Sequence, residues 1–339
     1  MNIFESTFEK HKQLMMEKLN SELKPIQTKM SKIMNLPMGN SFVQYLRSAV
    51  QDPKVVEFLR AAKADNSTND DKITVSGPTL VSVKGIRATQ SEVFIGKSME
   101  FPIKDKTKHQ QIKNYILNGQ DGDMPPIIIS GNFVIDGHHR WSQVFCWNSE
   151  SKIKAYDIQI QGVKSVDDIL KKMQLGIAAT RGGLPLEDKP GAGNLFTMDD
   201  GAITKWLVTK ILQYDAYDVF ADPEVSVRMK TAIGINESEI DEKYAPYALQ
   251  GKDKRFGDRP EKEKTSKEDS ESQKKKVEYI RTVVGPYISK NANALKQNVG
   301  KFERKIMPQT GLDASGNDAK IEDFVNMMKS GNVNVDVNT

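Results

Sequence analysis

The chain has 339 residues, 38% of them hydrophobic and 28% charged, with a formal net charge of +4 and one cysteine. This length is typical of about two domains, and so small a net charge neither requires nor excludes a nucleic-acid partner. One cysteine excludes an internal disulfide, so we expect Cys146, in an apolar stretch, to be a buried thiol in a reducing compartment.

The N-terminus begins Met1-Asn2-Ile3 and continues with mixed charge. It lacks the basic region and apolar stretch of a signal peptide. No part of the chain approaches ~18 consecutive apolar residues, the length that a membrane-spanning helix needs. We therefore expect a cytoplasmic protein without a membrane partner, located in the host cytoplasm if a bacteriophage encodes it.

Apolar residues at a spacing of three to four predict helices in residues 3–34 and 40–63, so we assign residues 1–63 to an N-terminal helical segment. We expect its methionine-rich faces to pack on the next domain, on a second copy of the chain or on a partner protein. Residues 64–77 are polar and without periodicity, which predicts a linker.

Residues 78–163 have a different pattern, which predicts a small domain with a sheet. Alternation predicts strands near 80–83 and 154–161, and residues 108–117 have helical spacing. Residues 126–135 predict two strands joined by a tight turn at Gly131-Asn132, followed by a helix from His138 through Cys146. The expected fold class is α+β, a small mixed sheet flanked by helical segments.

The remainder of the chain divides into three predicted parts. Residues 164–250 form a helical C-terminal region, and residues 251–276 are a charged run with few apolar residues, which predicts a disordered linker. Residues 277–339 are predicted to form a helix and a tail, with a short helix near Phe324. The tail includes Met307-Pro308-Gln309-Thr310.

The run Asp-Gly-His-His-Arg at residues 136–140, called the 136–140 motif below, is the main candidate for chemistry. A strand that leads directly into a helix directs unpaired backbone N–H groups out of the end of the sheet, where they favour an anion. Gly137 permits close backbone approach, and His138, His139 and Arg140 add donors for phosphate. Asp136 is able to orient a histidine, hold a metal or cap the helix.

Less specific interpretations of these residues stay open. Adjacent histidines leave a helix in different directions, and four histidines with one cysteine make a zinc site improbable. One alternative is that Asp136 only caps the helix, and Trp141 is expected to pack in the core rather than stack on a base.

The segments 125–129 and 134–141 resemble the signature of the ParB/sulfiredoxin superfamily, over about a quarter of the chain. The Asp-Gly-His-His-Arg form resembles members that bind ATP or ADP and phosphorylate small molecules. Sulfiredoxins carry Gly-Cys-His-Arg and partition-type ParB proteins carry Gly-Glu-Arg-Arg, so His138 departs from both. By the same resemblance, a carboxylate after the first strand is the base, which points to Glu92, and Lys97 is placed to meet phosphate.

The resemblance implies an enzyme that uses ATP or another nucleotide with Mg²⁺ to transfer a phosphoryl group to a hydroxyl. The acceptor is a small molecule or, if the chain comes from a bacteriophage, a modified DNA base. A ParB-like metal-dependent DNA nuclease and a non-catalytic phage structural or interaction protein are the alternatives. The candidate catalytic residues are Glu92, Asp136, His138 and His139, the candidate phosphate-binding residues are Gly137, His138, His139, Arg140 and Lys97, and the candidate metal ligand is Asp136.

Overall fold

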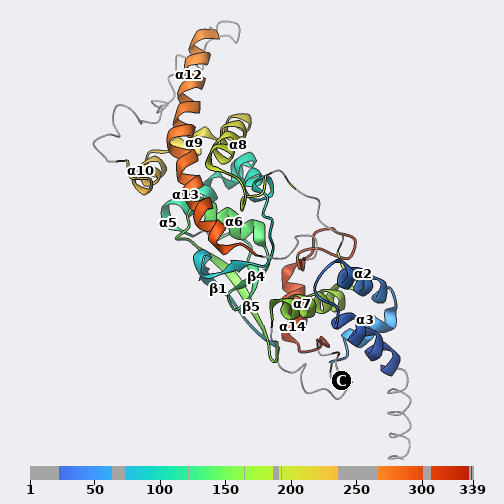
Figure 1. Ribbon diagram of the computed structural model, residues 1–339. Helices are drawn as coiled ribbons and strands as arrows, with labels where there is room; N and C mark the ends of the chain where they lie inside the picture. Colours follow the sequence, from blue (N-terminus) through green and yellow to red (C-terminus); the bar gives the residue numbers. More distant parts are fainter. Residues whose placement is uncertain are drawn as a thin grey trace, which may run out of the picture.

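The computed structural model describes residues 23–62, 73–120, 122–163, 165–185, 191, 193–235, 266–300, 307–335 and 337. It has an α+β fold in which a five-stranded mixed sheet lies between two groups of helices (Figure 1). No helix in the described ranges has the length and apolar character needed to cross a bilayer.

The strand order of the sheet is β1-β5-β3-β4-β2. The β1–β5 and β3–β4 pairs are antiparallel, whereas β3–β5 and β2–β4 are parallel. The short edge strand β2 has no counterpart in the sequence prediction. The strands are β1 (Ile73–Ser82), β2 (Arg87–Ala88), β3 (Ile127–Ser130), β4 (Phe133–Asp136) and β5 (Lys152–Ile160).

The β3–β4 hairpin forms as the sequence predicts. All four residues of β3 are buried, as expected for a run of β-branched side chains in the interior of a sheet. Gly131 has a φ of 58° in the turn, and its N–H donates to Asp157 Oδ1 of β5 at 2.9 Å. This hairpin ends at Asp136 and therefore fixes where the 136–140 motif begins.

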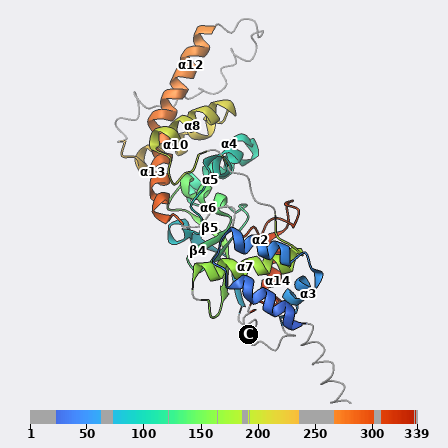
Figure 2. The ribbon, with the colours of Figure 1, turned by 45° about the vertical axis from the view of Figure 1, so that its right-hand side comes forward.

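One face of the sheet is covered by α6 (His138–Trp147), whose Trp141 and Trp147 are fully buried. The helices α8 and α13 close the same core (Figure 2). The helices of this group are α4 (Phe101–Lys104), α5 (His109–Asn118), α6, α8 (Asp200–Gln213), α9 (Tyr217–Ala221), α10 (Pro223–Ala232), α12 (Ser266–Tyr279) and α13 (Gly285–Leu295). Short helical turns are η3 (Val83–Gly85), η4 (Gly96–Glu100), η5 (Lys106–Lys108), η8 (Ile280–Val284) and η9 (Lys296–Asn298).

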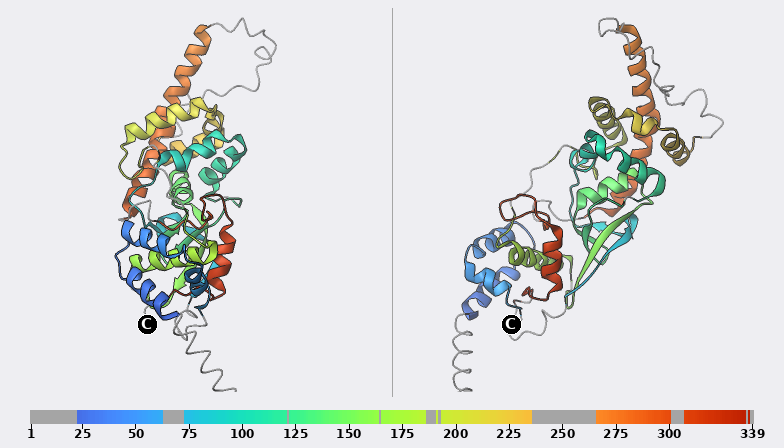
Figure 3. Two further views of the ribbon diagram at one scale, coloured as in Figure 1. Left: turned by 90° about the vertical axis from the view of Figure 1, so that its right-hand side faces the viewer. Right: turned by 180° about the vertical axis from the view of Figure 1, so that it is seen from behind.

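A second core lies on the other face of the sheet, where Ile128, Ile135 and Ile158 of the strands are buried. It brings the N-terminal helices together with the end of the chain, as Figure 3 shows from two sides. Within the predicted range 40–63, helix is confirmed at 40–49 and 53–59, and the predicted helix near Phe324 is confirmed as well. The elements are a helix at residues 23–34, α2 (Asn40–Ala49), α3 (Pro53–Leu59), α7 (Val166–Arg181) and α14 (Ile321–Lys329).

Two predicted boundaries are wrong. Residues 73–77 belong to β1 rather than to a linker at 64–77, because Ile73 and Val75 pair with Ile160 and Ile158 of the long strand β5. Residues 266–276 belong to α12 rather than to a disordered run at 251–276, since this helix continues through η8 into the buried helix α13. Parts of the predicted segments, at residues 1–22, 63–72, 236–265 and 301–306, lie outside the described residues.

The expected domain at 78–163 also does not have a core of its own. Most of its buried side chains form one cluster with those of α8, η8 and α13, which follow it in the sequence by more than 35 residues, while Ile128, Ile135 and Ile158 belong to the second core. The helix α10 of this cluster lies in the predicted helical region 164–250, but its bounds were not predicted, because its Pro223 start and its mixed composition give no strong periodicity.

Candidate functional site at the start of α6

The strand β4 passes into α6 through a single residue, Gly137. Its φ is 92°, in the left-handed region, and a Cβ atom at this position would lie 2.5 Å from Ile127 Cγ2. Only glycine fits both the conformation and the space. The first helical hydrogen bond runs from Trp141 N to Gly137 O at 2.9 Å, so the N–H groups of residues 138–140 precede the helical ladder.

Asp136 forms hydrogen bonds to a distant part of the chain. Its Oδ1 accepts from Gly137 N at 2.7 Å. Its Oδ2 accepts from both the N–H and the hydroxyl of Thr310, at 2.8 and 2.5 Å. The carboxylate therefore binds a hydroxyl group, and that hydroxyl belongs to a residue 174 positions later in the chain.

Thr310 is fully buried and is held from its other side by α7. Arg181 Nη2 donates to the carbonyls of Thr310 and Lys320, at 3.1 and 2.6 Å. Arg181 Nη1 also forms an ion pair with Asp323 of α14 at 3.1 Å. Sequence reasoning missed both Thr310 and Arg181, because a tail residue and a helix-terminal arginine carry no local signal of their contact.

His138 is buried, with 5% of its surface exposed, and its ring faces the segment after β2. Thr89 N donates to His138 Nε2 at 3.1 Å, which makes Nε2 an acceptor and places the ring proton on Nδ1. Thr89 Oγ1 donates to Val134 O at 2.6 Å. His138 therefore connects the β2 edge of the sheet to α6, and it does not face solvent as a predicted phosphate donor would.

His139 leaves α6 in a different direction, as predicted for adjacent residues of a helix. It is half-buried, and its Nδ1 lies 3.2 Å from Ser98 Oγ of η4. Ser98 Oγ lies in turn 2.8 Å from Ser142 Oγ. Lys97 precedes Ser98 in η4 and is half-buried, so the structure brings these two candidates onto adjoining elements.

Glu92 has an exposed side chain in the loop between β2 and η4. No shared hydrogen bond joins its side chain to the described residues of the 136–140 motif.

Arg140 lies against the main chain that leads into β3. Its Nη1 donates to the carbonyls of Pro126 and Pro125, at 2.7 and 3.2 Å. Burial lowers the pKa of the Arg140 guanidinium, and the nearby carboxylates of Asp136 and Glu322 act in the opposite direction. Arginine remains a cation at neutral pH under such conditions, so this is a positive charge beside Asp136.

Residues from the C-terminal part of the chain lie over the motif, and we call Gly300 together with residues 307–310 the C-terminal crossing. Gly300 N donates to Gln90 O at 3.1 Å, and a Cβ on Gly300 would lie 2.6 Å from Ala88 O. Met307 Sδ lies 3.3 Å from Thr89 Oγ1. The crossing therefore contacts the segment 88–90 as well as Asp136.

The predicted roles of Cys146 and Trp141 agree with the structure. Cys146 is fully buried, and burial raises the pKa of its thiol to about 12, so it is a packing residue rather than a nucleophile. Trp141 is fully buried, and its Nε1 donates to Val83 O at 2.9 Å. Within the described ranges, His, Cys, Asp and Glu side chains form no group of three that is able to hold a metal.

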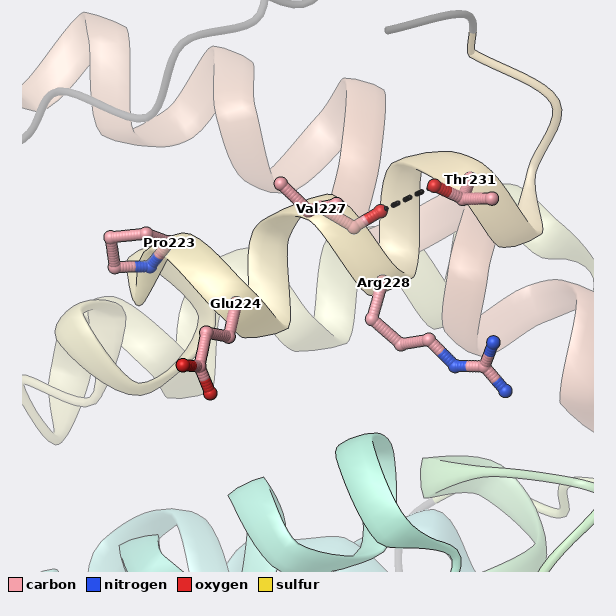
Figure 4. A pocket seen from close by; sticks show the side chains of 5 residues that line it. All are labelled: Pro223, Glu224, Val227, Arg228 and Thr231. Carbon is pink, nitrogen blue, oxygen red and sulfur yellow. Dashed lines mark hydrogen bonds between the residues drawn. The ribbon is translucent and has the colours of Figure 1, made fainter.

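Surface hollows are present on other elements. One of about 460 Å³ runs along α10, where Glu224 and Arg228 extend from the helix (Figure 4). Another of about 540 Å³ lies between α8 and η8–α13 and includes Lys205 and Arg281. The second hollow is a competing place for an anion, because it combines these two cations with the hydroxyl-bearing residues Thr204 and Ser289.

Comparison of the chain with protein-family models, curated proteins and solved structures gives no match.

Proposed function

We propose that the start of α6 binds the phosphates of ATP or another nucleoside triphosphate and that this site transfers the terminal phosphoryl group to a hydroxyl. One observation carries the proposal: Asp136 Oδ2 accepts a hydrogen bond from a hydroxyl at 2.5 Å. A carboxylate that already binds a hydroxyl is in the position of a general base toward that group. The resemblance of residues 125–141 to the ParB/sulfiredoxin superfamily favours the same chemistry.

The neighbouring groups have the charge and the donors that a phosphate needs. The N–H groups of residues 138–140 lie at the positive end of the α6 dipole. In the proposal, His139 and Lys97 meet the phosphate oxygens from α6 and η4, because both are half-buried and on adjoining elements. Phosphoryl transfer depends mainly on positioning and on charge neutralisation, so a few such groups suffice.

His138 and Arg140 have a positioning role in this proposal. His138 holds the segment after β2 against α6, and Arg140 holds the Pro125-Pro126 main chain beside Gly137. Removal of either one is expected to displace the helix start and thereby weaken nucleotide binding indirectly.

Mg²⁺ enters the proposal with the nucleotide. Magnesium in proteins is commonly held by one or two carboxylates together with substrate phosphates and water. Asp136 supplies one such carboxylate, and its two oxygens accept three hydrogen bonds from Gly137 and Thr310. The bond to the Thr310 hydroxyl favours Asp136 as base over Asp136 as metal ligand.

A second candidate function is a non-catalytic interaction protein, and one observation favours it. Asp136, His138 and Arg140 all bond to main-chain atoms of this chain, at Thr310, Thr89 and the Pro125-Pro126 segment respectively. A motif kept only for folding would show this pattern.

The test uses the full-length chain with labelled ATP, Mg²⁺, DNA and a mixture of hydroxyl acceptors, followed for ATP binding, ADP formation, label transfer and strand breaks. Asp136→Asn is expected to slow transfer by about 10²–10⁴-fold, the usual contribution of a general base. Asp105→Asn is the matched control, because Asp105 bonds a threonine hydroxyl in the same way but far from α6 in the sequence.

Each result favours one reading of the site. Transfer that fails in Asp136→Asn but survives in Asp105→Asn supports the proposal. Transfer that fails in Glu92→Gln alone makes Glu92 the base, as the family resemblance implies. DNA strand breaks without ATP would identify a nuclease. If the chain binds no ATP, a non-catalytic interaction protein is the remaining candidate.

A further inference from the structure

We propose that the hollow between α8 and η8–α13, called the α8–α13 hollow below, binds a small phosphate monoester whose organic part carries hydroxyl groups. The hollow has a volume of about 540 Å³ and includes no residue of the 136–140 motif. A volume of this size is in the range of small-molecule sites. The ligand is a second one, distinct from the nucleotide of the proposed transfer reaction.

The hydroxyl of Ser289 is the group that points to a ligand. This residue of α13 lines the hollow, and only 2% of its surface is exposed. Its Oγ has no hydrogen-bond partner within the described ranges of the chain. Buried hydroxyls in folded proteins nearly always have a partner, so this hydroxyl requires a polar group on the side of the hollow. A hydroxyl of a ligand is such a group.

The helices α8 and α13 lie side by side at the hollow and run in opposite directions (Figure 2). Asn293 Nδ2 near the end of α13 donates to Asp200 Oδ1 at the start of α8, at 3.0 Å. Two turns earlier in α13, a Cβ on Gly285 would lie 3.0 Å from Thr204 Cβ, one turn later in α8. The order of these two contacts defines the ends of the hollow. Ser289 lies between them, toward Asp200.

The end of the hollow away from Asp200 is cationic. Arg281 lies one turn before Gly285 and therefore at this end, and Lys205 follows Thr204 on α8. Arginine binds phosphate through two parallel N–H groups, and lysine adds a point charge, so the pair balances the two charges of a phosphate monoester. Arg281 belongs to η8, a turn of π-helix, which is a rare geometry that frequently marks functional sites.

The end of the hollow at Asp200 suits hydroxyl groups instead. The Asp200 carboxylate repels a phosphate but accepts a hydrogen bond from a hydroxyl, and Ser289 is able to donate or accept one. Val208 and Pro286 add apolar contacts. A phosphate at Arg281 with a hydroxyl at Asp200 and Ser289 therefore satisfies the groups of the hollow. A triphosphate would bring negative charge against Asp200.

Isothermal titration calorimetry of the full-length chain tests the hollow with three probes, which are glycerol 3-phosphate, inorganic phosphate and glycerol. We expect both phosphates to bind, glycerol 3-phosphate more tightly, and glycerol alone not to bind. Arg281→Met is expected to weaken the binding of both phosphates about tenfold or more, because a charge-assisted contact is lost. Arg228→Met is the matched control, since Arg228 is an exposed arginine in the other hollow, along α10.

Ser289→Ala tests the orientation of the ligand. Alanine is well tolerated inside a helix, so the fold is expected to survive. Because one hydrogen bond to the organic part is lost, we expect the affinity for glycerol 3-phosphate to fall about threefold to tenfold. The affinity for inorganic phosphate should not change. Equal weakening of the two phosphates, or no weakening of either, would overturn the role of Ser289 and with it the proposed ligand.

Hydrogen exchange locates the bound ligand. With glycerol 3-phosphate, exchange at the backbone amides of residues 204–209 and 281–289 should slow, while that of residues 137–141 stays the same. The proposal is overturned if neither phosphate binds, if Arg281→Met binds them as before, or if Arg228→Met weakens them equally. Protection confined to residues 137–141 also overturns it and leaves the proposed function standing.

Discussion

Two aspartate–threonine pairs in this protein have the same hydrogen bonds and different consequences. Asp105 Oδ1 accepts from the N–H and the hydroxyl of Thr107, at 3.0 and 2.7 Å. Asp136 Oδ2 accepts from the N–H and the hydroxyl of Thr310, at 2.8 and 2.5 Å. In each pair one carboxylate oxygen receives both donors of one threonine.

The two pairs differ in how much of the chain must fold before they form. Asp105 lies two residues from Thr107, forms solvent-exposed bonds to it, and caps the short turn η5. Such caps form from local sequence alone. Asp136 and Thr310 are 174 residues apart, and joining them requires the sheet, α7 and the C-terminal crossing. Forming the distant pair therefore requires the ordering of many more residues than a local cap requires. A role beyond capping is the better explanation of this pair.

The largest effect is expected from a substitution that displaces Asp136. Gly137→Ala introduces a Cβ in the left-handed region and 2.5 Å from Ile127 Cγ2. Backbone strain and overpacking together are expected to lower the free energy of unfolding by about 2–5 kcal/mol. Gly162→Ala is the control, because its φ is 80° but nothing lies within 4 Å of the added atom. Urea denaturation measures the free energy of unfolding of both variants. Equal losses in the two variants would show that contact with Ile127 is unimportant.

Removal of Arg181 tests the support behind Thr310. Arg181→Met keeps the length of the side chain but loses the donors to the Thr310 and Lys320 carbonyls. Because buried hydrogen bonds from a charged group are lost, we expect the free energy of unfolding to fall by about 3 kcal/mol. Hydrogen exchange at residues 309–313 should speed up, whereas the exposed Arg281→Met should leave it unchanged. Unaltered exchange in Arg181→Met would mean that the C-terminal crossing is held elsewhere.

The two threonines allow a direct contrast. Thr310→Val removes a hydroxyl that is bonded to a carboxylate in a buried position. We expect the free energy of unfolding to fall by about 2 kcal/mol. Thr107→Val removes the same bond at the surface, and we expect no resolvable change in the urea midpoint. A larger effect at Thr107 than at Thr310 is the result that this account does not allow.

The smallest expected effect concerns the pKa of Asp105. The hydroxyl of Thr107, followed by its N–H, lowers the pKa of this carboxyl. Thr107→Val should therefore raise the pKa toward its ordinary value of 3.8. Because the folded pKa is depressed, the associated stability is present above the unfolded pKa and is lost as the pH falls through the folded pKa. NMR titration measures the shift, and an unchanged midpoint would assign the lowering to other groups.

Local parts of the site could be predicted from the sequence, and distant parts could not. The hairpin, Gly137 and the start of α6 follow from turn chemistry and periodicity within a dozen residues. The partners of Asp136 and His138 come from Thr310 and Thr89, which no periodicity connects to the motif.

The contacts of Arg140 could not be predicted from the sequence for a similar reason. A first-turn arginine is exposed only when nothing covers that side of the helix, and the Pro125-Pro126 main chain covers it here. Likewise, residues 266–276 are helical because they extend from α13, which is buried against α6 and α8. Composition alone does not show what the neighbouring helix imposes on such a run.

The central claim is that nucleotide phosphates bind at the start of α6, and hydrogen exchange with and without ATP and Mg²⁺ tests it most directly. The account predicts slower exchange at the backbone amides of residues 137–141, with no change around Asp105–His109. Protection confined to the hollow at Lys205 and Arg281, or absent from the described chain altogether, would contradict it.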